Sequence, residues 1–128
     1  MPNYPVLKEK GHTINVDKEI LSIAEFFGID PKKEKLAFTI FLYLLDSSLK
    51  NKGIKTIDIA KSEKTTQAAV VYHLNYFIGR GFVIKKRREY FLIGKTLTET
   101  IDEMVQKYLQ NSDKMRKIAK IIDEHLIS

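Results

Sequence analysis

The pattern of apolar and polar positions predicts a chain built mainly of helices. Residues 18–27 repeat apolar side chains at helical spacing after a capping aspartate, and Gly28 ends the run. A second helix is expected to begin at Asp30-Pro31, as N-cap and first turn, and to reach Leu49. It is apolar nearly all round, so we expect it at the centre of the core. Five aromatic residues are expected to lie mostly in the core too: Phe38, Phe41, Tyr43, Tyr76 and Phe77.

A pair of shorter helices and a hairpin are predicted next. Thr56 is a candidate cap for a short helix, and Thr65 or Thr66 caps a longer one that Gly81 ends. Residues 82–93 alternate loosely between apolar and polar, which is typical of a hairpin. Its tip is cationic and lacks the Asn-Gly or Asp-Gly pair that tight hairpin turns favour.

The last segment carries a long heptad repeat. Residues 96–99 read Thr-Leu-Thr-Glu, which is a capping box. Apolar positions then recur at alternating steps of four and three, and a continuous helix would be about 46 Å long at 1.5 Å per residue. The repeat predicts a homodimer interface of Leu97, Ile101, Met104, Tyr108, Asn111, Met115, Ile118 and Ile122, with His125 at the next position.

Two interpretations of this segment remain open. Asn111 could fix the register of paired helices, as buried seam asparagines do in coiled coils. Alternatively, the helix breaks at Asn111-Ser112-Asp113 and folds back on its own core.

Length and composition favour one domain with appendages. With 128 residues, 44% of them hydrophobic, the chain can bury a core. We expect a mainly α (α+β) fold: an N-terminal arm over 1–16, a domain over 17–95 and a C-terminal dimerisation segment over 96–128. The absence of cysteine excludes disulfides and thiolate metal sites. No apolar run approaches the roughly 20 residues of a membrane span, and no signal peptide is evident, so a cytoplasmic location is expected.

The positive charge is concentrated in one part of the chain. The net charge is +6, and residues 51–95 alone carry 10 basic and 3 acidic side chains. The flanking segments are close to neutral. A localised basic excess is typical of proteins with a polyanionic partner.

The order of helix, turn, helix and basic hairpin indicates duplex DNA as that partner. The second helix of such a pair enters the major groove, and the hairpin tip reaches the phosphates or the minor groove. Asn and Gln can pair with adenine, helix N-termini suit phosphates, and Lys and Arg add salt-dependent affinity. The predicted DNA-binding residues are Thr65, Thr66, Gln67, Ala68, Tyr72, Asn75, Lys85, Lys86, Arg87 and Arg88.

The stretch VVYHLNYFIGRGFV also resembles the recognition helix of ArsR- and MarR-like winged helix-turn-helix regulators. The residues that match the family pattern are Val70, His73, Leu74, Phe77, Gly81, Phe82 and Val83, and Val71 stands where the family usually has serine. The resemblance covers residues 54–94 and implies a dimeric transcription factor with a two-stranded β-wing and a long C-terminal dimerisation helix. It does not indicate an effector, and a small-molecule effector has no support from the sequence.

Other functions have less support. The chain has no phosphate-binding glycine loop, metal-binding HExxH spacing or carboxylate pair placed with a base, so no enzyme, cofactor or metal is expected. Asp123 and His125 resemble half of a zinc site found on the C-terminal helix of ArsR-like proteins, and metal sensing is not expected. His73 is interpreted as a half-buried structural histidine. A non-specific architectural DNA-binding protein and a protein-interaction module are the alternatives to a regulator.

Overall fold

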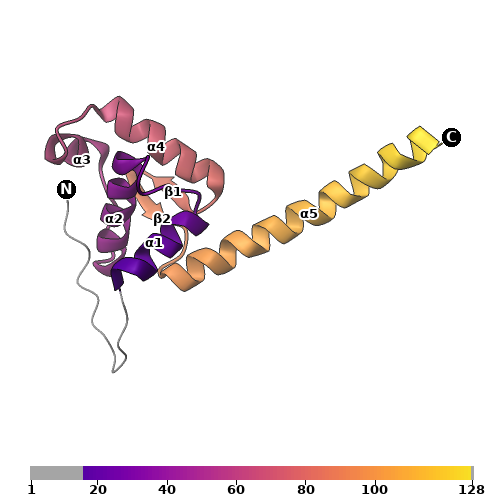
Figure 1. The fold of residues 1–128 in the computed structure, drawn as a ribbon, viewed down its shortest axis with the longest axis horizontal. Coiled ribbons are helices and arrows are strands. Elements are labelled where there is room, and N and C mark those ends of the chain that lie inside the picture. Colours follow the sequence, from indigo (N-terminus) through magenta and orange to yellow (C-terminus); the bar gives the residue numbers. More distant parts are fainter. Residues whose placement is uncertain (1–15, 128) are drawn as a thin grey trace, which may run out of the picture.

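The computed structural model describes residues 16–127, which form a mainly helical fold with one small sheet. The elements are α1 (Val16–Phe26), α2 (Lys35–Leu49), α3 (Thr56–Ser62), α4 (Gln67–Arg80), β1 (Val83–Lys86), β2 (Glu89–Leu92) and α5 (Leu97–Ile127). Figure 1 shows the first four helices and the hairpin packed into one body, from which α5 runs away as an arm. The predicted N-terminal arm lies outside the described residues, except that α1 already begins at Val16.

The predicted central helix is confirmed, but it begins later than the sequence indicated. In α2 a continuous run, Ala37 to Leu42, is buried together with Leu44 and Leu45. The expected start at Asp30-Pro31 is wrong. The Asp30 carboxylate accepts from the backbone N–H groups of Lys32 and Lys33, and the Glu34 carboxylate accepts from the N–H of Asp30. These bonds close a separate turn, so the continuous helix starts only at Lys35.

Four phenylalanines join the elements of the body. The rings of Phe27 and Phe82 are stacked at 4.3 Å between centroids, and Phe77 lies 4.9 Å from Phe82. Phe41 of α2 meets Phe27 edge to face at 5.6 Å. All four side chains are fully buried. The cluster therefore fixes α1, α2, α4 and the start of the hairpin with respect to one another.

The sheet is the predicted hairpin, extended by one residue from elsewhere in the chain. β1 and β2 are antiparallel, with Val83 opposite Leu92 and Lys86 opposite Glu89. Ile54, just before α3, forms an isolated bridge with Tyr90, with both N–H to O distances at 2.9 Å. The basic half of the hairpin is thereby held against the start of α3.

The C-terminal helix is continuous through Asn111, so of the two interpretations left open for this segment the break is wrong. At its start the Thr96 hydroxyl accepts from the N–H of Glu99 at 3.1 Å, but the Glu99 carboxylate bonds the N–H of Lys95 rather than that of Thr96. The capping box is thus only half formed. In the described residues, no helix is both long enough and apolar enough for a membrane crossing.

Candidate nucleic-acid interface

Helix α4 is fixed along its whole length, with its inner face as predicted. Val70, Leu74 and Phe77 are buried, and Thr66 caps the N-terminus by accepting from the N–H of Ala69 at 3.1 Å. At the other end Gly81 adopts a left-handed φ of 93°, and the Arg80 guanidinium donates to the carbonyl of Phe27 at 3.3 Å. A helix so anchored can present its outer face to a partner in a defined orientation.

The outer face of α4 carries the contact residues that were predicted within this helix. Gln67, Ala68, Tyr72 and Asn75 are exposed, and Tyr72 retains 71% of its accessible surface. Thr66 is also exposed, whereas Thr65 is half-buried and less available than predicted. Tyr76, which the sequence analysis placed with the core, is 45% exposed and joins this face.

A hydrogen bond between the two helices changes the interpretation of Gln67. The hydroxyl of Thr56, at the start of α3, donates to the Gln67 side-chain oxygen at 3.1 Å. Bidentate pairing with adenine uses both ends of an amide. Because one end of Gln67 already holds α3 against α4, Asn75 is left as the amide on this face that can make both bonds. Nothing local in the sequence indicates this pairing across 11 residues.

The α3 end of the helix pair is held by a second hydrogen-bonded group. The Tyr43 hydroxyl lies 2.7 Å from the Ser62 hydroxyl and donates to the Glu63 carboxylate at 2.7 Å. Burial raises the pKa of Tyr43, so the phenol stays protonated and remains a donor. This group fixes the end of α3 on α2, and the sequence analysis did not identify it.

The predicted cations form the tip of the hairpin and point in more than one direction. Lys85, Lys86, Arg87 and Arg88 are all exposed. The ammonium of Lys85 lies 5.4 Å from the centroid of the Tyr90 ring, while Lys86 belongs to the opposite face of the hairpin, opposite Glu89. The chain turns at Arg87 and Arg88, whose φ angles are 59° and 149°. Residues other than glycine rarely adopt such φ angles, and each one costs about 1–3 kcal/mol.

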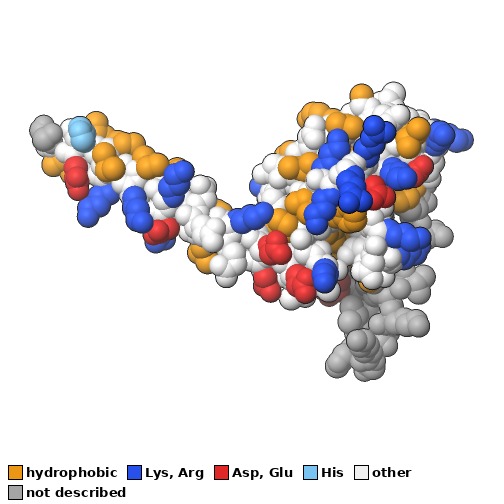
Figure 2. Space-filling model, turned by 180° about the vertical axis from the view of Figure 1, so that it is seen from behind, with side chains coloured by type: hydrophobic (Ala, Val, Ile, Leu, Met, Phe, Trp, Pro, Cys, Tyr) orange, Lys and Arg blue, Asp and Glu red, His pale blue; other side chains and the backbone are white. Residues whose placement is uncertain are grey.

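The hairpin tip and the N-terminal turn of α4 lie on the same side of the domain. Tyr90 pairs with Ile54, and two residues later Thr56 bonds to Gln67 in the first turn of α4. The basic half of the hairpin is therefore linked to that turn through a short series of direct contacts. Figure 2 shows one face of the domain where Lys and Arg side chains outnumber Asp and Glu.

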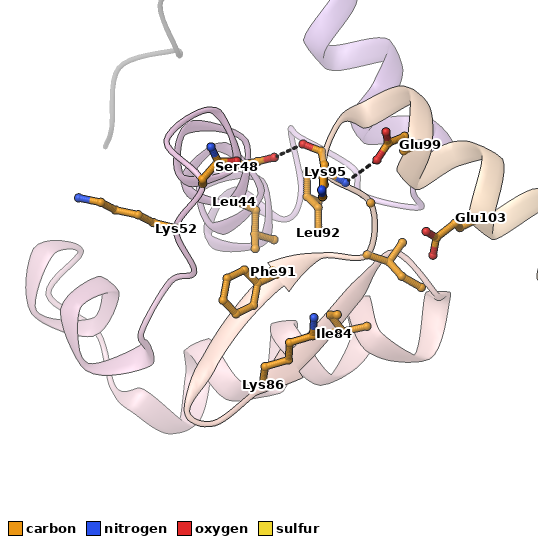
Figure 3. A pocket seen from close by; sticks show the side chains of 13 residues that line it. Leu44, Ser48, Lys52, Ile84, Lys86, Phe91, Leu92, Lys95, Glu99 and Glu103 are labelled. Atoms are coloured by element: carbon orange, nitrogen blue, oxygen red, sulfur yellow. Dashed lines mark hydrogen bonds between the residues drawn. The ribbon is translucent and has the colours of Figure 1, made fainter.

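A hollow of about 360 Å³ lies behind the hairpin. Figure 3 shows Leu44 and Ser48 of α2, Ile84 and Phe91 of the hairpin, and Glu99 of α5 among the residues around it. The Ser48 hydroxyl donates to the carbonyl of Lys95 at 3.1 Å, which ties α2 to the start of α5. The lining of the hollow mixes lysines with glutamates, and no buried side-chain polar atom in residues 16–127 is left without a partner. We assign it no ligand.

The histidines give no sign of a metal site. No group of three or more His, Asp or Glu side chains among the described residues is placed to hold a metal ion. His73 is half-buried on α4, as predicted, and its ring meets Tyr72 edge to face. Burial lowers the pKa of His73, and the Glu34 carboxylate opposes that shift only in part.

This lowered pKa predicts a loss of stability in mild acid. Below about pH 6.5 the unfolded chain takes up a proton at His73 that the folded chain still excludes, so stability falls as the pH drops through this window. We expect urea denaturation to show a larger decrease between about pH 7 and pH 5 for the parent chain than for a His73→Gln variant. Equal decreases in the two proteins would show that folding does not lower the pKa of His73.

In comparisons with known proteins, no protein-family model, no curated protein and no solved structure matches the chain.

Proposed function

We propose that this chain is a sequence-specific duplex-DNA-binding regulator of transcription that acts as a homodimer. In this proposal α3, α4 and the hairpin form a winged helix-turn-helix, with α4 in the major groove and the basic wing on the backbone or in the minor groove. The carrying observation is the juxtaposition of the exposed N-terminal turn of α4 with the cationic hairpin tip, linked through Ile54 and Thr56.

The backbone at the tip supports a role for these cations outside the folded chain. Glycine would satisfy the φ angles of Arg87 and Arg88 without strain. The two side chains are exposed and take no part in the salt bridges that Lys50 forms with Asp46 and Lys117 forms with Asp113. Strained positions of this kind concentrate at functional sites. A phosphate backbone is a partner that would use two adjacent arginines at a protruding turn.

Non-specific DNA binding is the second candidate, and the position of Gln67 favours it. Since Thr56 holds the amide oxygen of Gln67, the outer face of α4 offers few groups that can distinguish one base pair from another. The phosphate-directed cations would then supply nearly all the affinity.

Selection of duplexes from a random pool, followed by competition with unrelated DNA, separates the two candidates. For a specific regulator we expect a recurrent site and tight binding that survives excess competitor. An Asn75→Ala variant should then lose about 1–3 kcal/mol at the selected site and almost nothing on unrelated DNA. Equal losses on both DNAs would favour the non-specific candidate, and no binding to any duplex at low salt would reject both.

An exposed position on α3 supplies the matched control for Asn75. Asp58 is exposed on the neighbouring helix, and Asp58→Ala removes a side chain of similar size that faces away from the core. It should leave the preference between the selected site and unrelated DNA unchanged. A change in preference as large as that of Asn75→Ala would show that base reading is not confined to α4.

A further inference from the structure

The outer part of α5 has no packing partner within the described chain. We call residues 105–127 the α5 arm; Figure 1 shows it leaving the body of the domain and projecting alone. Large apolar side chains are exposed along it, including Tyr108 at 72%, Ile122 at 53% and Leu126 at 79%. Most of the stability of helices in proteins comes from tertiary packing, and soluble monomers seldom leave so long an apolar strip uncovered.

Most of the exposed apolar residues of the arm share one continuous face. Figure 2 shows apolar side chains along one edge of the outer part of the arm and charged ones along the other. At heptad spacing the face comprises Tyr108, Met115 and Ile122, then Asn111, Ile118 and His125, and then Val105, Ser112, Ala119 and Leu126. A regular face of this width is typical of a helix that pairs with another helix.

At the base of α5, the chain's own domain already covers the heptad face. Leu97, Ile101 and Met104 continue the same heptad positions toward the N-terminus of the helix, and they pack against the core of their own domain. Thr100, between them, is completely buried. The first three residues of the predicted dimer interface therefore serve the chain's own fold, and the part left for a partner begins beyond Met104.

The coverage of this face at the base of α5 decides between parallel and antiparallel pairing of two identical helices. In a parallel pair, each helix would lie along the face of the other from base to tip. The domain already occupies that place at the base, so each domain would collide with the start of the partner's helix. In an antiparallel pair the two arms overlap only beyond Met104, and the domains lie at opposite ends. The antiparallel arrangement avoids the collision.

We propose that a second copy of this chain covers the α5 arm as an antiparallel helix, with the two-fold axis between Arg116 and Lys117. In this register Met115 faces the partner's Ile118, Asn111 faces the partner's Ile122, and Tyr108 faces the partner's His125. Beside these layers, Val105 meets the partner's Leu126 and Ser112 meets the partner's Ala119. The small side chains of Ser112 and Ala119 allow the two helices to approach closely.

Two features of the arm favour this register over its neighbours. A slip of one heptad toward the domains would place the partner's Ile122 on Met104 and the partner's His125 on Ile101, which the chain's own core covers. A slip outward would leave fewer apolar layers in contact. The chosen register also brings a phenol hydroxyl and an imidazole together at each end, and these groups can form a hydrogen bond. The His125 ring is oriented by its Nδ1 contact with the carbonyl of Ile121 at 2.9 Å.

The pairing specifies the homodimer on which the proposed function rests. Along the helix pair, Val105 and the partner's Val105 are 23 residues apart, or about 34 Å at 1.5 Å per residue. The domains lie beyond these points, so the two recognition helices would be separated by at least about one turn of DNA. We therefore expect half-sites whose centres lie one or more turns apart, and not half-sites that overlap.

Directed disulfide formation tests the orientation, because the chain contains no cysteine of its own. Tyr108→Cys and His125→Cys variants, distinguished by a size tag, are oxidised separately and as an equimolar mixture. The antiparallel pairing predicts a cross-linked dimer of both variants in the mixture and no cross-link within either variant alone. Gln110→Cys mixed with Asp123→Cys is the matched control: these positions lie at the same height but on the outer sides of the two helices, and should stay unlinked.

The opposite pattern would overturn the proposal. Cross-linking of each variant with itself would show a parallel pair. To guard against disruption by the cysteines, the unmodified chain and an Ile118→Glu variant are compared by light scattering. A dimer that Ile118→Glu converts to a monomer supports the pairing, and a monomeric unmodified chain rejects it. The readouts need no DNA; a cross-linked dimer that binds no duplex would contradict the proposed function and leave the pairing intact.

Discussion

Replacing both arginines at the hairpin tip by glycine should weaken duplex binding and stabilise the fold at the same time. Arg87 and Arg88 have φ angles of 59° and 149°, which glycine adopts at little cost. Relief of this strain should stabilise the domain by about 1–2 kcal/mol, or several degrees in melting temperature. Loss of two phosphate contacts should flatten the slope of log affinity against log salt by about two.

The two effects are measured separately, by thermal denaturation and by fluorescence titration of labelled duplex across a salt series. Arg87→Lys with Arg88→Lys is the matched control, since it keeps both charges and the same backbone angles. It should leave the melting temperature nearly unchanged and retain most of the salt dependence. An unchanged slope in the glycine variant would show that the tip does not touch DNA, whatever its effect on stability.

An opposition between stability and binding at one turn would explain a local conflict in the sequence. A tight hairpin favours Asn-Gly or Asp-Gly, and this chain has two arginines there instead. Departures from local preference are expected where function sets the residue. The absence of a turn signal, which made the hairpin difficult to predict, is then itself a functional indication.

The predictions that succeeded depend on short-range chemistry. Helix α4 begins after Thr66 and ends before Gly81, as predicted. Capping by a hydroxyl and termination by a left-handed glycine each depend on only a few neighbouring residues. Where a carboxylate accepts from an N–H other than the one expected from the capping motif, local reasoning failed. Glu34 closes the turn that Asp30 begins, and Glu99 bonds Lys95 instead of completing the capping box.

The relations between elements could not be predicted from the sequence. The bond between Thr56 and Gln67 depends on the angle between two helices, and no periodicity encodes it. The heptad repeat of α5 has the same limitation. Its spacing indicates an apolar face, but Leu97 and Ile101 cover the chain's own core while Ile118 and Ile122 remain exposed. A repeat is the same whether its partner is the same chain or another copy.

Tyr76 shows a different kind of error, since its position was available from the sequence. On a helical wheel it lies about 100° from Phe77 and about 120° from Val70, to one side of the buried face, whereas only its aromatic character suggested the core. In the structure it is 45% exposed. Aromatic residues next to a recognition face are better assigned from their angle on the helix than from their hydrophobicity.

Replacing Phe82 by alanine should cause the largest loss of stability in the domain. Its ring is fully buried, stacked on Phe27 at 4.3 Å and placed 4.9 Å from Phe77, so its removal leaves a cavity bordered by the rings of Phe27 and Phe77. Truncation of a buried phenylalanine costs about 3–5 kcal/mol, which is a large share of the 5–15 kcal/mol typical of a folded domain. Denaturant titration of the parent and the variant measures this loss.

Phe26 provides a control of the same residue type one position away from the cluster. Its side chain is 51% exposed although its ring lies 5.7 Å from that of Phe27, so Phe26→Ala should cost far less than Phe82→Ala. Similar losses of stability at the two positions would show that burial in the phenylalanine cluster does not determine the stability of the domain. Phe82 is also the residue through which α4 continues into β1. If the cluster fixes the wing relative to the recognition helix, a Phe82→Leu variant that remains folded should bind duplex DNA more weakly than the equally folded Phe26→Ala.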